Sequence, residues 1–352
     1  MSAKPILIVD NLKKYYELRG SFLQVLGIKP PTYLRAVDGI TFSIDRGEIF
    51  CLVGESGCGK TTTGRLIVRL TKPTSGSILY RPSDELKNYL ESQGFANEYI
   101  DLGKHYPKQI DKALRREIQI IFQDPYSSLN PRMKIKDILE EPLIIHGIGD
   151  KPSQRLEIIL KALQEVKLTP PEEFVERYPH MLSGGQRQRV AIARALILKP
   201  SLIVADEPVS MLDVSIRVEI LQLMLDIKKS RNISYLFITH DLAVASYVCN
   251  KIAVMYLGKI VEMGDADKVV ENPLHPYTKA LIESVPEPDP RNRLTLRKID
   301  IKGEVPSAVN IPSGCRFHPR CPYTMDICRR EEPPMIEIEN GHKVACWLYA
   351  KK

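Results

Sequence analysis

Residues 54–61, Gly54-Glu55-Ser56-Gly57-Cys58-Gly59-Lys60-Thr61, decide the fold, because they fit the pattern G-x-x-x-x-G-K-[ST]. The apolar run Ile49 to Val53 precedes them and predicts a buried strand, and a helix is expected to follow as far as Leu70. In this order of strand, glycine loop and helix, successive backbone N–H groups surround phosphate oxygens at the start of the helix. The stretch therefore predicts a phosphate-binding loop in an α/β domain.

Each part of this loop has an expected role toward a nucleotide. A side chain at Gly57 or Gly59 would block the close approach of a phosphate. Lys60 supplies positive charge for the β- and γ-phosphates, and Thr61 offers a hydroxyl to Mg²⁺. The residues expected to bind the nucleotide here are Gly54, Glu55, Ser56, Gly57, Cys58, Gly59, Lys60, Thr61 and Thr62.

Polar residues follow two further apolar runs. Asp206 and Glu207 come directly after residues 202–205, and His240 comes after residues 233–238. Both runs predict buried parallel strands, and open parallel sheets bind ligands at the carboxyl edge of their strands. We expect Asp206 to orient Mg²⁺, usually through water, and Glu207 to orient or deprotonate the attacking water.

The rest of the chain divides by pattern. From about residue 125 to 198 the spacing of apolar residues is helical, which predicts a helical subdomain inserted into the α/β core. Residues 81–112 are polar and lack an obvious period, so their structure is left open. Proline becomes frequent after about residue 272, at Pro273, Pro276, Pro286, Pro288 and Pro290, which indicates a linker into a C-terminal part.

Composition excludes several classes of protein. The chain has 352 residues and a net charge of +7, without a basic tail, which argues against a dedicated nucleic-acid binder. It has no run of about 18 apolar residues and no signal-peptide pattern at its start, so we expect it to stay in the cytoplasm. In that reducing compartment the cysteines are expected to stay unpaired, with Cys51, Cys58 and Cys249 as ordinary small apolar residues.

Leu182-Ser183-Gly184-Gly185-Gln186 resembles the signature of the ABC ATPase family. The resemblance implies a P-loop NTPase (RecA-like) core with an inserted helical subdomain and an antiparallel β subdomain. It also implies that Ser183, Gly184, Gly185 and Gln186 bind the γ-phosphate held by an opposite subunit, because they begin a helix. Two chains would therefore close around ATP, and one chain alone would not be the catalytic unit.

The other landmarks of this family match in order. Gln123 resembles the Q-loop glutamine, which contacts the metal and the water, and Asp213 ends a stretch that resembles the D-loop. His240 resembles the switch histidine that contacts the γ-phosphate. With Glu207 and Lys60, Gln123 and His240 are the expected catalytic residues. Tyr16 stands where the family carries an aromatic side chain that stacks on adenine, with Tyr15 as the alternative.

Three stretches resemble the oligopeptide, dipeptide and nickel importer branch of the family: residues 125–132, residues 275–278 and the C-terminal cysteine region. Residues 64–66, residues 73–76 and the intact signature look like the second of the two ATPase chains in these importers. The implied partners are a second homologous ATPase subunit, two transmembrane permeases and an extracellular solute-binding protein, with the chain on the cytoplasmic face of the membrane. The expected domains are 1–270, which binds nucleotide, and 271–352, a C-terminal extension.

Four cysteines gather near the C-terminus, in the spacing C-x5-C-x6-C-x17-C: Cys315, Cys321, Cys328 and Cys346. Four thiolates can hold either Zn²⁺ or an iron–sulfur cluster. The C-x2-C pairs typical of structural zinc are absent, which favours iron–sulfur, and in this branch the region is associated with a [4Fe-4S] cluster. Zinc and free buried thiols remain the alternatives.

The function expected is therefore ATP hydrolysis that drives import of di- or oligopeptides. Oligosaccharide or nickel import by the same family is the first alternative, because the cargo is not written in this chain. A soluble ABC ATPase of DNA repair or translation is disfavoured, because such proteins usually carry long coiled coils or two cassettes in one chain, and neither is present. A catalytically silent subunit is disfavoured because Lys60, Glu207 and His240 are all present.

Overall fold

The structure is a computed structural model that describes residues 4–18, 31–284, 301 and 303–350. Its centre is an eight-stranded sheet in the order β11-β12-β10-β9-β3-β8-β7-β6. Five neighbouring strands of it run parallel: β9 (Lys251–Tyr256), β3 (Ile49–Val53), β8 (Ser234–Thr239), β7 (Leu202–Asp206) and β6 (Ile118–Ile121). Every residue of β3, β7 and β8 is buried, as expected for a parallel sheet that is covered on both faces. The α/β fold predicted from the apolar runs is confirmed.

Alternate side chains of the parallel strands enter two separate hydrophobic cores. Phe50 and Leu52 of β3 pack with α2 (Lys60–Ile67) in one core. Ile49, Cys51 and Val53 face the other core, which contains α9 (Gly184–Leu196), α10 (Val214–Arg231) and α11 (Leu242–Val248). This division follows from the two-residue period of a strand.

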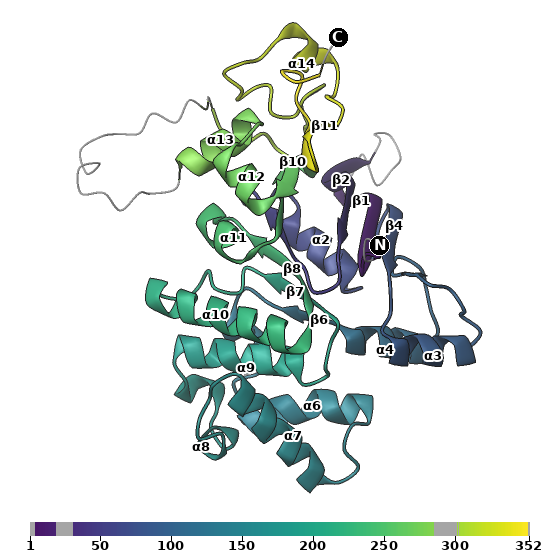
Figure 1. Ribbon diagram of the computed structural model, residues 1–352, viewed down its shortest axis with the longest axis vertical. Helices are drawn as coiled ribbons and strands as arrows, with labels where there is room; N and C mark the ends of the chain where they lie inside the picture. The colour runs from purple at the N-terminus through teal and green to yellow at the C-terminus, as the bar shows by residue number, and fades with distance from the viewer. Residues whose placement is uncertain (1–3, 19–30, 285–300, 302, 351–352) are drawn as a thin grey trace.

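A second, four-stranded sheet is antiparallel where its strands pair and has the order β2-β1-β4-β5. Its strands are β1 (Leu7–Leu18), β2 (Thr32–Ile44), β4 (Ser75–Tyr80) and β5 (Ile100–Asp101). It shares a core with α2, and in Figure 1 it stands beside that helix. The expected antiparallel β subdomain is therefore present.

Residues 125–198 contain mainly helices, which lie at the lower end of the molecule in Figure 1. They are α5 (Pro125–Ser128), α6 (Ile135–His146), α7 (Pro152–Glu165), α8 (Glu172–Val175), the short 3₁₀ helix η1 (Pro179–Met181) and α9. Helices α6 and α7 each contact α9, which also lies against β6. The inserted helical region is thus attached to the edge of the parallel sheet.

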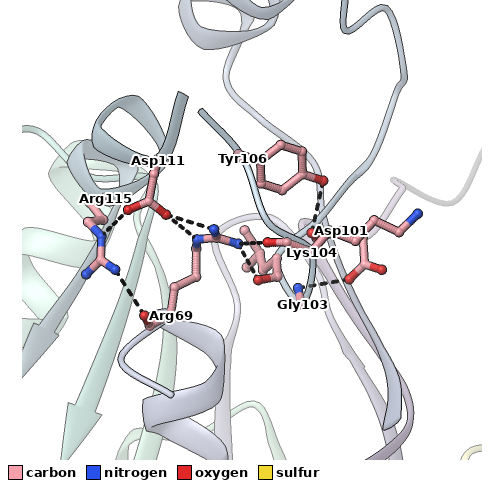
Figure 2. Close-up of polar contacts among 8 residues, drawn as sticks. Arg69, Asp101, Gly103, Lys104, Tyr106, Asp111 and Arg115 are labelled. Atoms are coloured by element: carbon pink, nitrogen blue, oxygen red, sulfur yellow. Dashed lines mark hydrogen bonds and ion pairs between the residues drawn. The ribbon is translucent and has the colours of Figure 1, made fainter. Parts of the chain in front are cut away.

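The stretch whose structure the sequence left open is ordered. It contains α3 (Asp84–Ser92), β5 and α4 (Lys108–Glu117). Arg69, just after α2, holds it in place (Figure 2): its Nε donates to Asp111 Oδ1 at 2.8 Å, and its Nη1 donates to the carbonyls of Leu102 and Lys104. Arg115 donates to the other oxygen of Asp111 at 2.8 Å and to the carbonyl of Arg69 at 3.0 Å. The stretch with α3, β5 and α4 is therefore anchored at the C-terminal end of α2, the helix that follows the phosphate loop.

The C-terminal part adds to the central sheet. After β10 (Lys259–Asp265) come α12 (Ala266–Glu271), α13 (Pro276–Glu283), α14 (Asp326–Arg330), β11 (Ile336–Glu339) and β12 (His342–Val344), and β12 pairs with β10. Glu262 of β10 is fully buried and accepts from the backbone N–H groups of Leu274 and His275, each at 2.8 Å, while His342 Nε2 lies 2.8 Å from it. The prolines at 286, 288 and 290 lie outside the described residues, and the domain boundary at about residue 270 stays a prediction.

One expectation about the cysteines is wrong. The structure pairs Cys51 of β3 with Cys249, just after α11, as a disulfide with their Cα atoms 5.9 Å apart. No local pattern indicates this pair, because the two positions are 198 residues apart and become neighbours only when α11 packs beside β3. Among the described residues, no helix has the length and apolar character needed to cross a membrane.

Candidate nucleotide-binding site

A cavity of about 710 Å³ lies at the carboxyl edge of the parallel strands. The phosphate loop follows β3, Gln123 follows β6, Glu207 follows β7 and His240 follows β8, and all four elements line it. Its lining contains eleven of the residues expected from the sequence: Tyr16, Glu55, Ser56, Gly57, Gly59, Lys60, Thr61, Thr62, Gln123, Glu207 and His240. These residues come together because neighbouring parallel strands end at one edge.

The glycines of the phosphate loop are required by its own backbone. A Cβ atom on Gly54 would lie 2.2 Å from the carbonyl oxygen of Met255, and one on Gly59 would lie 2.2 Å from that of Ala36. Gly57 adopts φ +80° and faces open space. Gly59, with φ +108°, is therefore needed both for close packing of the loop against β2 and for its backbone conformation, while Gly57 is needed for its conformation alone.

Lys60 is held inside the loop. Its Nζ donates to the carbonyls of Gly54 at 2.6 Å and Glu55 at 3.0 Å, and only 5% of the residue is exposed. Cys58, also expected to bind the nucleotide, is buried beneath the loop, and its burial raises the pKa of its thiol. The loop thus curls around its own ammonium group and presents Ser56 and Gly57 outward.

Thr61 and Asp206 form a pair of oxygen donors beside the loop. Thr61 Oγ1 donates to Asp206 Oδ1 at 3.0 Å, and Asp206 is buried at the end of β7. Burial raises the pKa of Asp206, and the neighbouring Glu207 raises it further. Hydroxyl and carboxylate oxygens are the ligands that Mg²⁺ prefers, and Mg²⁺ usually takes few of them from the protein, so these residues fit that ion.

Glu207 is the point on which the polar side chains of the site converge. Its Oε2 accepts from Gln123 Nε2 at 3.0 Å and lies 3.1 Å from His240 Nδ1. The backbone of Glu207 has φ +47°, a conformation that a residue with a side chain rarely adopts and that clusters at functional sites. Its amide donates to the carbonyl of Ile238, which holds the turn against β8.

The two candidate aromatic side chains have different surroundings. Tyr16 lines the cavity together with Leu34 and Ala36, and the Nζ of Lys14 lies 4.9 Å from the centre of its ring. The hydroxyl of Tyr15 donates to the carboxylate of Asp38, and burial together with that contact raises its pKa to about 12. Tyr15 is therefore occupied in a structural contact, and Tyr16 is the tyrosine that lines the cavity.

The signature residues do not line this cavity. Ser183 caps α9 by accepting from the amide of Gln186 at 3.2 Å, while Gln186 Oε1 accepts from the amide of Ser183 at 3.0 Å. Gly184 and Gly185 lie between them, and a Cβ on Gly185 would meet Ile216 of α10 at 2.7 Å. Ser183 and Asp213 are exposed, so this face is open to solvent in the single chain.

The sequence did not indicate several residues around the cavity. Tyr277 Oη accepts from the amide of Glu55 at 2.8 Å, and Arg320 donates to both carboxylate oxygens of Glu55. No local pattern marks these contacts, because Tyr277 and Arg320 are 222 and 265 residues away from Glu55. The remaining unexpected lining residues are Leu34, Ala36, Leu281 and Ala308.

The four C-terminal cysteines are neighbours, but not in a metal-holding arrangement. Cys328 and Cys346 are buried, Cys315 and Cys321 are half-buried, and the amide of Cys315 donates to the carbonyl of Cys328 at 2.8 Å. Burial raises the pKa of Cys315 to about 12, and the thiols of Cys328, Cys346 and Cys321 contribute to the rise. Within the described ranges, no three or more histidine, cysteine or acidic side chains form a group that could hold a metal ion. The structure thus gives no support to the predicted metal site.

Comparison with known families and proteins agrees with this geometry. Residues 37–210 match the family described as ABC transporter, and residues 261–328 match the oligopeptide/dipeptide transporter C-terminal region. The chain is 44% identical over 345 residues to the dipeptide transport ATP-binding protein DppF of Haemophilus influenzae, covering 97% of this chain and 96% of that protein. It is 43% identical to the oligopeptide transport ATP-binding protein AppF of Bacillus subtilis, over 98% of each chain.

Solved structures show the same fold. The ATP-binding cassette MJ0796, in a dimeric post-hydrolysis state bound to ADP and Pi, is similar with a TM-score of 0.59 and 27% identity, covering 74% of this chain and 98% of that one. CbiO1 of Clostridium perfringens, part of an ABC transporter complex, has a TM-score of 0.59 and 26% identity, covering 76% and 91%. The chain therefore belongs to the ABC transporter family as an ATP-hydrolysing, ATP-binding subunit that carries the C-terminal region of the oligopeptide and dipeptide transporters.

Proposed function

We propose that this chain binds ATP in the cavity at the edge of the sheet and hydrolyses it to drive the import of di- or oligopeptides. The main support for hydrolysis is that Gln123 and His240 both contact the Glu207 carboxylate, beside the phosphate loop. The peptide cargo rests on relatives named for dipeptide and oligopeptide transport. Oligosaccharide or nickel cargo remains the alternative.

In this proposal each side chain has a defined role toward ATP, Mg²⁺ or the attacking water. Lys60 exchanges its contacts with the loop carbonyls for the β- and γ-phosphates of ATP. Thr61 and Gln123 would contact Mg²⁺ and Asp206 would orient it, usually through water, and the ion would neutralise charge on the phosphates. Glu207 accepts the proton of the attacking water, Gln123 orients that water, and His240 donates to the γ-phosphate. Tyr16 stacks on the adenine.

The second half of the site comes from a partner subunit. Ser183, Gly184, Gly185 and Gln186 lie at the start of α9, where Ser183 is exposed. This position is suited to a phosphate, yet they do not line the cavity of their own chain. Apolar residues near them are solvent-exposed in the described chain, with Met211 61% and Val214 75% exposed. MJ0796, which has the same fold, is dimeric. We propose that this chain pairs with a second homologous ATPase subunit, as the second chain of a heterodimer.

The transporter would be completed by two permeases and an extracellular solute-binding protein, with this chain peripheral on the cytoplasmic face. A surface suited to a permease lies after Gln123, where Tyr126 is 57% exposed and is held by Arg187, whose guanidinium lies 3.7 Å from the centre of the tyrosine ring. We propose no nucleic-acid partner, because the net charge of +7 is mild for a chain of this length.

The cysteine segment is proposed to hold a structural [4Fe-4S] cluster, with Zn²⁺ as the alternative. Its support is the shared neighbourhood of the four thiols, and ligation requires them to move closer than they are here. Anaerobically purified protein would contain iron and sulfide and absorb near 400 nm, as iron–sulfur centres do. If the protein contains zinc and no iron, the site is the alternative zinc site. If it contains neither zinc nor iron, the proposal that the cysteines bind a metal is refuted.

The function is tested in proteoliposomes that contain the complete transporter. Peptide-loaded solute-binding protein should stimulate ATP hydrolysis and peptide uptake, and both should disappear with Glu207→Gln in this chain. Stimulation by oligosaccharide-loaded or nickel-loaded binding protein, with no response to peptide, would refute the peptide assignment and leave the hydrolysis intact.

A further inference from the structure

Arg320 links the C-terminal cysteine segment, residues 315–346, to the phosphate loop. Its Nη1 donates to Glu55 Oε2 at 2.8 Å, and its Nη2 donates to Glu55 Oε1 at 3.2 Å. Only 9% of the arginine side chain and 29% of the glutamate side chain are exposed. Such a two-pronged pair between an arginine and a carboxylate is among the strongest and most directional ion pairs in proteins.

The position of the Arg320 guanidinium is fixed by its surroundings. It lies 5.8 Å from the ring centre of Tyr256 and 6.0 Å from that of Phe317. The rings of Tyr256, Tyr277 and Phe317 pack on one another with centres 4.8 to 5.5 Å apart. Since Tyr277 also accepts from the amide of Glu55, this aromatic cluster supports both contacts to the same loop residue.

The backbone of the cysteine segment sets where Arg320 begins. The amides of Arg320 and Cys321 both donate to the carbonyl of Phe317 at 3.0 Å, which closes a tight turn between Cys315 and Cys321. In the same turn, Arg316 donates to the carbonyl of Leu257 and to the carboxylate of Asp38. The turn is therefore attached at two points, to β2 at Asp38 and to the turn between β9 and β10 at Leu257.

Glu55 lines the cavity that is proposed to receive the phosphates of ATP. A free carboxylate there would repel those phosphates, because like charges at short range in a partly buried site interact strongly. Arg320 neutralises that carboxylate, while Tyr277 accepts from the Glu55 amide, the first amide of the loop after Gly54. The positive charge of Arg320 thus favours ATP binding without contacting the nucleotide.

We propose that Arg320 is a positioning residue for ATP binding, through which the C-terminal cysteine segment holds the phosphate loop in its binding conformation. The inference rests on the proposed nucleotide site. The inference goes beyond that site by giving the C-terminal extension a direct part in nucleotide affinity. It does not depend on whether the cysteines hold a metal.

The test compares KM for ATP and kcat in the assembled transporter. Arg320→Ala is expected to raise KM about tenfold, because the carboxylate of Glu55 loses its counter-charge and repels the phosphates, with little change in kcat. Arg320→Lys keeps the charge but loses the two-pronged geometry, so its KM should be intermediate. Arg330→Ala removes an exposed arginine from the same segment and should leave both constants unchanged.

A second substitution separates positioning from a loss of folding. In Arg320→Ala, adding Glu55→Gln removes the unpaired carboxylate and should bring KM back to within about threefold of the parent, since the repulsion is gone. A merely structural role predicts no such recovery. Unchanged KM in Arg320→Ala, or a double variant as impaired as Arg320→Ala, would overturn the proposal.

The same series shows which of the two proposals fails. Lys60→Ala should weaken ATP binding by calorimetry whatever Arg320 does, because a phosphate counter-charge is lost. Normal ATP affinity in Lys60→Ala would refute the nucleotide site itself. Weak binding in Lys60→Ala together with normal KM in Arg320→Ala would refute only the role of Arg320.

Discussion

At the residue scale, the chemistry of the site depends on how Glu207 is oriented. Its carboxylate contacts side chains from the two neighbouring strand ends, and its backbone is held in a rare conformation by contacts to β8. His240 is 58% exposed, so its imidazole can turn from Glu207 toward a bound nucleotide without a rearrangement of the core.

His240→Ala is therefore expected to lower turnover by at least about a hundredfold, the usual cost of removing one positioned hydrogen-bond donor to the reacting group. ATP affinity should change little, because most contacts to ATP come from the phosphate loop and the aromatic stack. Single-turnover and equilibrium binding measurements on one preparation decide this, with the exposed His105→Ala as the control. A large loss of affinity with normal turnover would reverse the assignment.

Tyr16 makes a separate prediction at the same scale. Tyr16→Ala should weaken ATP binding about three- to tenfold, the range expected for the loss of one aromatic stack. Tyr16→Phe should keep the parent affinity, because the proposed stack needs the ring and not the hydroxyl. Fluorescence titration with an adenine nucleotide measures both variants, and an unchanged affinity in Tyr16→Ala would exclude the stack.

The sequence could predict this half of the site because its residues follow recognisable strands. Gln123, Glu207 and His240 come at the carboxyl ends of apolar runs, and parallel strands bring such ends together. Tyr277 and Arg320 could not be predicted in the same way. Their contacts with Glu55 depend on how the C-terminal part packs, which no local pattern records.

At the element scale, the insertion between β4 and β6 shows why periodicity failed for residues 81–112. Helices α3 and α4 have only 9 and 10 residues. Each buries just one pair of apolar residues spaced four apart, Leu86 and Leu90 in α3, and Ile110 and Leu114 in α4. Two apolar positions are too few to reveal a helical period, and the anchor through Arg69 and Asp111 is polar.

Helix α13 carries a pH-dependent prediction. His275 caps it by accepting from the amide of Tyr277 at 3.0 Å, and complete burial lowers the pKa of His275 to about 3. The unfolded chain binds a proton near the ordinary histidine pKa of about 6.5, whereas the folded chain does not until about pH 3. The stabilising effect of a neutral His275 is therefore complete above about pH 6.5 and decreases as the pH falls below it.

His275→Asn keeps a capping oxygen but cannot take up this proton. Between pH 4 and 6 its unfolding free energy should fall less steeply with decreasing pH than that of the parent, by up to about 1.4 kcal/mol per pH unit. Denaturant unfolding at several pH values measures the slope. Equal slopes in the two proteins would show that His275 is not the group that titrates.

At the scale of the whole molecule, the nucleotide cavity and the signature lie at separate places on the chain. The cavity lies at one edge of the sheet, while the signature at the start of α9 faces solvent. The sequence indicated this arrangement through the resemblance of its motifs to a family. It did not indicate that β12 extends the central sheet, because β12 pairs with β10 and His342 contacts Glu262 across about 80 residues of sequence, which no local pattern records.

Exposed apolar residues beside the signature predict association with the second ATPase subunit. Val214→Asp should weaken ATP-dependent pairing about tenfold or more, because it places a charge in an apolar contact. The helix itself should survive, since an acidic residue at the start of α10 is favourable. Analytical ultracentrifugation measures the pairing, with Val305→Asp as the exposed control. Equal pairing in both variants would place the interface elsewhere.

The most direct test of the account is Glu207→Gln in the assembled transporter, measured by single-turnover ATP hydrolysis and by equilibrium ATP binding. The amide preserves the shape of the side chain but cannot accept a proton. We expect ATP affinity within about threefold of the parent and a hydrolysis rate at least about a hundredfold lower. Equal hydrolysis rates for the variant and the parent would contradict the claim that Glu207 is the catalytic carboxylate of this subunit.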